Sequence, residues 1–154
     1  MGLDKLRTLY QAVILDHANH PRNKRQLTSP TTTMTVHNPT CGDTINLQVQ
    51  TKGNRITDIA FTGSGCSISQ ASASMMTEAV KGRTTQDALT MAKTFSDMAI
   101  GKQHDADDLR QLGDAQVLVN IMQFPARIKC VTIAWWTLER ALAKEEETGE
   151  QRSK

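Results

Sequence analysis

The chain has 154 residues, of which 38% are hydrophobic, and a formal net charge of +2 from 18 basic and 16 acidic residues. This length fits a single domain over residues 1–154, and no stretch approaches the roughly 18 apolar residues that a membrane-spanning helix needs. The charges are too balanced for the concentrated basic face of a nucleic-acid-binding protein. The N-terminus lacks the apolar core of a signal peptide, so we expect a cytoplasmic protein that binds neither membrane nor nucleic acid.

An amphipathic helix is predicted over residues 3–18, because Leu6, Tyr10, Val13 and His17 recur on one helical face. The proline of the following NHPRN sequence ends this helix, since proline disfavours helical backbone in the residue before it.

Three runs rich in β-branched residues come next, at residues 33–38, 44–51 and 55–63. Their alternation of apolar and polar residues predicts three antiparallel strands. The KGN sequence at Lys52–Asn54 predicts a hairpin turn between the second and the third strand.

The chain turns helical after Cys66. Ser67 and Gln70 form an S-x-x-Q capping box that predicts a helix start, and Gly82 is a natural stop. A second helix is expected between Thr84 and Gly101. The polar sequence KQHDADDLRQLGD predicts a loop with a short helical turn, and AQVLVNIMQF predicts another short helix.

Pro125 begins the last helix, at a position where its missing N–H costs nothing. A buried stripe is predicted along this helix at Ile128, Val131, Trp135, Leu138 and Leu142. The charged end, about residues 144–154, is expected to fray. The predicted fold is therefore α+β: a three-stranded antiparallel sheet with an N-terminal helix and several C-terminal helices packed on one face.

Three cysteines, Cys41, Cys66 and Cys130, are an odd number in a chain without an export signal. A disulfide framework is not expected, which leaves core thiols, a catalytic thiol or metal ligands. Their separations of 25 and 64 residues exclude a zinc finger or ribbon, whose ligands come as close pairs. A site built from them would have to be assembled by the fold.

The first two cysteines lie in glycine-containing loops. Gly42 lets the backbone turn so that Cys41 and Asp43 can point at one centre, although C-x-D alone is more typical of an ordinary loop. Cys66 lies where a strand meets a helix N-terminus, and the positive end of the helix dipole there favours a thiolate. Cys66 is thus a candidate ligand or nucleophile, with helix-start packing as the equal alternative.

Cys130 lies in the second turn of the last helix, next to Val131 of the predicted buried stripe. A cysteine in such a place is usually a small core residue. Here Arg127 and Lys129 add positive charge, which predicts a stabilised thiolate. Three thiolates and the Asp43 carboxylate suit tetrahedral zinc, or one edge of an iron–sulfur cluster.

The cysteine motifs NPTCGD, GSGCSISQASASMM and PARIKC, together with LYQAVILDHANHPRN at Leu9–Asn23, resemble the IscU/SufU family of iron–sulfur cluster assembly, which is similar to the NifU N-terminal domain. The resemblance covers nearly the whole chain and weakens after about Ala143. The sequence departs from the family at Ala18, where an aromatic residue is usual.

Two positions and one insertion favour the SufU branch over the scaffold branch. IscU scaffolds carry a histidine where this chain has Lys129, and Arg127 matches an arginine characteristic of SufU proteins. The insertion at residues 82–115 also resembles SufU. The resemblance implies a zinc-dependent sulfurtransferase; the alternative is an IscU-type scaffold on which a [2Fe–2S] cluster is assembled, and a third reading is a zinc-stabilised binding module without chemistry.

Carried over residue by residue, the resemblance implies Zn²⁺ ligands at Cys41, Asp43, Cys66 and Cys130. It implies that Cys41 accepts persulfide sulfur from the SufS cysteine desulfurase, a pyridoxal phosphate enzyme. The sulfur would pass to downstream SufBCD-type cluster assembly machinery. Arg127 would help to dock SufS or to neutralise the site.

Four other residues carry weaker signals. We expect His17 to be a packing histidine, His37 a strand residue and His104 a solvated residue of the insertion. Trp136, beside the buried stripe, is a candidate for partner contact.

Overall fold

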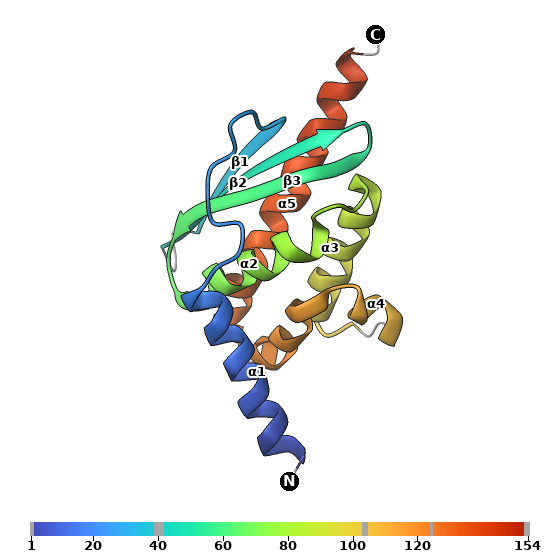
Figure 1. Cartoon of the computed structure of the whole chain (residues 1–154). Helices are drawn as coiled ribbons and strands as arrows, with labels where there is room; N and C mark the ends of the chain where they lie inside the picture. Colours follow the sequence, from blue (N-terminus) through green and yellow to red (C-terminus); the bar gives the residue numbers. More distant parts are fainter. Residues whose placement is uncertain (1, 39–41, 103–104, 124, 153–154) are drawn as a thin grey trace.

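A three-stranded antiparallel sheet, in the spatial order β1-β2-β3, forms one layer of the computed structural model (Figure 1). The strands are β1 (Thr32–Asn38), β2 (Asp43–Lys52) and β3 (Arg55–Ser64). Alternate residues of β2 are buried from Asp43 to Val49, so one face of the sheet packs on the helices. The three predicted strands and the hairpin turn after β2 are confirmed.

Helices precede and follow the sheet, which confirms the predicted α+β class. They are α1 (Gly2–Asn19), α2 (Ser67–Val80), α3 (Thr85–Ala99), α4 (Ala106–Arg110), the 3-10 helix η1 (Gly113–Gln123) and α5 (Pro125–Arg152). The short helix expected after the polar loop is thus a 3-10 helix. Fraying of the charged tail stays a prediction.

The structure describes a defined part of the chain. Backbone is described for residues 2–38, 42–102, 105–123 and 125–152, and side chains for residues 8–38, 42–102, 105–118 and 127–143. Within these ranges, no helix combines the length and the apolar character that crossing a membrane requires.

The long helix α5 crosses the sheet on its buried side (Figure 1). Val131, Trp135 and Leu138 of the predicted stripe are fully buried, and the Trp135 ring stacks on Phe95 of α3 with centroids 4.8 Å apart. The neighbouring Trp136 is 44% exposed, about 100° around the helix from Trp135. This packing fixes the rotation of α5 and thereby turns Cys130, one residue before Val131, into the interior.

Buried His17 holds α1 against the rest of the molecule. Its Nδ1 lies 2.8 Å from Ser74 Oγ on α2, and its Nε2 lies 2.8 Å from Asp114 Oδ2 on η1. Ser74 Oγ also accepts the backbone N–H of Arg22 at 2.7 Å. Although serine, histidine and aspartate also make hydrolytic triads, Ser74 is 0% exposed and unreachable by substrate. The prediction that His17 is a packing histidine is confirmed.

The helix boundaries around α3 follow the predicted signals. Thr84 caps α3 by accepting the backbone N–H of Asp87 at 3.0 Å. Gly82 follows the end of α2 and has a φ of +84°, as expected for a helix-terminating glycine.

Candidate metal centre

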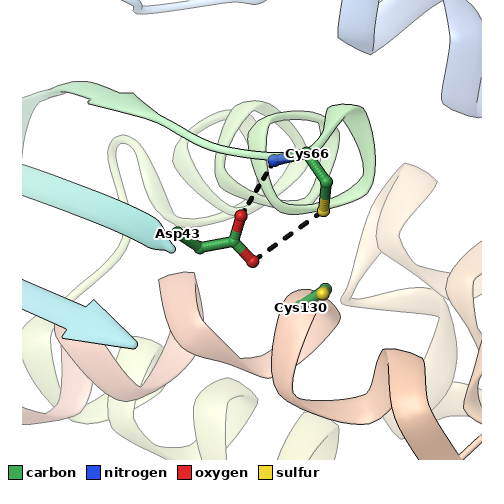
Figure 2. Close-up of side chains that lie close together, drawn as sticks. All are labelled: Asp43, Cys66 and Cys130. Atoms are coloured by element: carbon green, nitrogen blue, oxygen red, sulfur yellow. Dashed lines mark hydrogen bonds between the residues drawn. The ribbon is translucent and has the colours of Figure 1, made fainter. Parts of the chain in front are cut away.

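Asp43, Cys66 and Cys130 come together at one point of the interior (Figure 2). Asp43 is the first residue of β2, Cys66 joins β3 to α2, and Cys130 lies on α5. One carboxylate oxygen and the two sulfur atoms all lie within 4.8 Å of one another. The fold therefore unites three of the four predicted ligands, and Cys41 lies outside the described residues.

The Asp43 carboxylate is bound on both oxygens by Cys66. The backbone N–H of Cys66 donates to Oδ1 at 2.8 Å, and the Cys66 thiol donates to Oδ2 at 3.8 Å (Figure 2). Asp43 is 0% exposed, so these contacts replace water around a charged group. Because Oδ1 is held by the backbone, Oδ2 is the oxygen that faces the two sulfur atoms.

Gly65 makes this approach possible. Its φ is +136°, and a Cβ added there would lie 2.0 Å from Asp43 Oδ1 and 2.9 Å from Asp43 Cα. No other residue type fits that space without displacing Asp43. Gly63 and Gly65, the glycines before Cys66, thus allow the backbone of β3 and its end to lie close to the start of β2.

Cys66 itself is the N-cap of α2, which corrects the predicted capping box. Its Sγ accepts the backbone N–H of Ser69 at 3.4 Å. The Gln70 side chain donates to Ser69 Oγ at 3.4 Å and does not reach back to Ser67. The capping box at Ser67 and Gln70 is wrong because the sulfur one residue earlier satisfies the helix N-terminus.

Cys130 is only 3% exposed. Burial, together with the neighbouring Cys66 and Asp43, raises the pKa of the Cys130 thiol far above its ordinary value. The prediction that Arg127 and Lys129 stabilise a thiolate here is wrong for the metal-free protein. Both of those side chains are exposed, whereas burial of the sulfur and the neighbouring Cys66 and Asp43 disfavour its thiolate.

The residues present fit a zinc ion. Adjacent ligand atoms of a tetrahedral zinc site with sulfur and oxygen donors are about 3.5–3.8 Å apart, and Cys66 Sγ lies 3.8 Å from Asp43 Oδ2. Two thiolates and a carboxylate in one buried place repel one another unless a cation compensates them. Asp43, Cys66 and Cys130 would hold the ion and leave a fourth position to a further ligand.

The two other histidines considered from the sequence, His37 and His104, are not among the described residues that meet at the centre. His37 is exposed on β1 with its Nδ1 2.7 Å from Thr44 Oγ1, which confirms it as a strand residue. His104 lies outside the described residues. The sequence analysis did not identify Ser69 as a hydrogen-bond partner of Cys66. A serine in the first turn of a helix does not by itself indicate such a role.

Comparison with known proteins identifies the family. A sequence profile of the NifU-like N-terminal domain matches residues 9–131. Bacillus subtilis zinc-dependent sulfurtransferase SufU is 50% identical over 141 residues, which cover 92% of this chain and 94% of that protein. The iron–sulfur cluster assembly scaffold protein IscU of Streptococcus pyogenes is 44% identical over 144 residues, 94% of this chain and 89% of that protein.

A solved structure agrees with these relatives. The protein from Fervidobacterium islandicum AW-1, described as a cluster assembly scaffold for the SUF system, superposes with a TM-score of 0.80 at 32% identity. The match covers 88% of this chain and 98% of that chain. The chain belongs to the NifU-like N-terminal domain family, the IscU/SufU proteins of iron–sulfur cluster assembly, as its cysteine motifs predict.

Replacing Gly65 by alanine should weaken metal binding, because the new Cβ displaces the Asp43 carboxylate. We expect Gly65→Ala to weaken zinc binding at least about tenfold, measured by competition with a chromogenic chelator. Gly53→Ala is the matched control, since Gly53 also has a positive φ (+65°) but open space around its Cα. That control should lose about 1 kcal/mol of unfolding free energy and bind zinc normally; equal zinc affinity in both variants would contradict the role of Gly65.

Zinc binding should release protons from the apoprotein. The pKa of Cys130 is raised in the metal-free fold, so its thiol is protonated at neutral pH, whereas a metal-bound sulfur is a thiolate. The apparent zinc affinity should therefore rise with pH between about 6 and 8. Calorimetric titration in buffers of different ionisation enthalpy measures the number of protons released, and zero release would refute a thiol ligand.

Proposed function

We propose that this chain is a zinc-dependent sulfurtransferase that accepts persulfide sulfur on Cys41 from a SufS-type cysteine desulfurase, for iron–sulfur cluster assembly. The observation that carries the proposal is the convergence of Asp43, Cys66 and Cys130 at a buried point. Support also comes from the zinc-dependent sulfurtransferase that is 50% identical to it.

The burial of the other two cysteines supports Cys41 as the sulfur acceptor. Cys130 is 3% exposed, too little for a partner's persulfide to reach its sulfur. The sulfur of Cys66 is half-buried and already accepts a backbone hydrogen bond. Cys41, separated from buried Asp43 by the exposed Gly42, is the remaining acceptor.

The proposed transfer is a thiol–persulfide exchange. The Cys41 thiolate attacks the outer sulfur of the desulfurase persulfide and forms a new S–S bond. The old S–S bond breaks, and the desulfurase cysteine leaves as a thiolate, so no external oxidant or reductant is consumed. Zinc, when bound, supplies the positive charge that keeps the cysteine ligands deprotonated at neutral pH.

Two further assignments belong to this proposal. The exposed Arg127, in the first turn of α5, would contact the desulfurase beside the site. The persulfide on Cys41 would then be delivered to SufBCD-type assembly machinery. Exposed Trp136 is a second candidate for partner contact.

A scaffold function is the second candidate, because the S. pyogenes relative at 44% identity is named an IscU scaffold. The same thiolates could ligate a [2Fe–2S] cluster. Lys129 argues for the sulfurtransferase, since lysine is a poor cluster ligand at the position where the family resemblance gives scaffolds a histidine.

Cys41→Ala should abolish stimulation of the desulfurase under limiting reductant, because the persulfide has no acceptor. Sulfide production from L-cysteine by the paired proteins measures this. His37→Ala is a control, since His37 is exposed on β1 and its ring hydrogen-bonds Thr44 Oγ1. Undiminished stimulation by Cys41→Ala, with His37→Ala equal to wild type, would rule out Cys41 as the acceptor.

A further inference from the structure

Ser69 contacts Cys66 through both its backbone and its side chain. The Ser69 N–H donates to Cys66 Sγ at 3.4 Å, and Ser69 Oγ donates to the Cys66 carbonyl at 2.9 Å. Ser69 is 0% exposed, in the first turn of α2. Its side chain carries no ligand atom of the centre, so its influence on a metal would be exerted through Cys66.

Gln70 completes a chain of hydrogen bonds that leads to Cys66. Its Nε2 donates to Ser69 Oγ at 3.4 Å, which leaves the Ser69 hydroxyl hydrogen to the Cys66 carbonyl. Gln70 is 7% exposed, and its Oε1 has no hydrogen-bond partner among the described residues. The amide is therefore oriented by its bond to Ser69 and by packing.

Every polar atom of Cys66 is held by this arrangement. Its N–H donates to Asp43 Oδ1, its carbonyl accepts from Ser69 Oγ, and its Sγ accepts from Ser69 N–H. These contacts fix both the backbone of Cys66 and the direction of its Sγ toward the centre. A sulfur fixed in this way is oriented for a metal before the metal binds.

We infer that Ser69 is a positioning residue that fixes the Cys66 sulfur in the ligand position of the metal centre. This inference rests on the proposed zinc site and specifies which residue outside the ligand set orients Cys66. Ser69 acts as an outer-sphere partner, like the groups that orient metal-bound histidines and carboxylates in other sites.

Ser72 provides a matched control on the same helix. Its hydroxyl donates to the Val131 carbonyl at 2.6 Å, and it is also 0% exposed. Ser72→Ala thus removes one buried hydroxyl hydrogen bond, as Ser69→Ala does, without touching Cys66. Both variants should lose similar unfolding free energy.

The test compares Ser69→Ala, Ser69→Thr and Ser72→Ala in the full chain loaded with zinc or with Co²⁺. Ser69→Ala should bind zinc about tenfold more weakly, shift the thiolate-to-cobalt absorption bands, and show faster alkylation of Cys66 by peptide mass spectrometry. Ser69→Thr keeps the hydroxyl and should restore all three readouts. Ser72→Ala should match wild type in each.

Gln70→Met provides a second route to the same answer if Ser69→Ala does not fold. It removes the donor to Ser69 Oγ and should weaken zinc binding about threefold. Wild-type zinc affinity and cobalt spectra in Ser69→Ala, or equal losses in Ser69→Ala and Ser72→Ala, would overturn the inference. If the wild-type chain bound no zinc, the proposed function itself would fall, a result distinct from either of these.

Discussion

The hydrogen bond from the Cys66 backbone N–H to the Asp43 carboxylate joins the start of β2 to the start of α2. It depends on Gly65, because any side chain there would occupy the space of the carboxylate. It also fixes which oxygen of Asp43 faces the sulfur atoms. The metal centre, the cap of α2 and the connection between sheet and helices all meet at this one contact (Figure 2).

The same contact brings acidic groups together in the interior, and they require a compensating positive charge. One carboxylate oxygen and two sulfur atoms lie within 4.8 Å of one another, and burial together with this proximity raises the pKa of Cys130. A divalent cation would bind all three groups and compensate the mutual repulsion of the carboxylate and the thiolates. The net charge of the cluster would then be small enough to be buried. Burial also separates the two described cysteines, since Cys130 is 3% exposed whereas Cys66 is half-buried.

Much of the fold could be predicted from the sequence because local signals agreed with one another. The alternating strands, the Lys52–Asn54 turn and the α5 stripe around Trp135 are all present as predicted. The cap of α2 was misassigned because Ser67 and Gln70 match a familiar local pattern, whereas the cap is the sulfur of Cys66 one residue earlier, and cysteine is not among the usual N-cap residues. The raised pKa of Cys130 could not be predicted either, since it comes from burial and from neighbours 64 and 87 residues away in the chain.

Members of this family include a named zinc-dependent sulfurtransferase and named scaffolds. The metal that this chain holds decides between the two proposed functions. Metal analysis of the purified protein with an absorbance spectrum is the most direct test. We predict about one zinc per chain and no visible absorption band; iron with a visible sulfide-to-iron band and no zinc would contradict the sulfurtransferase account.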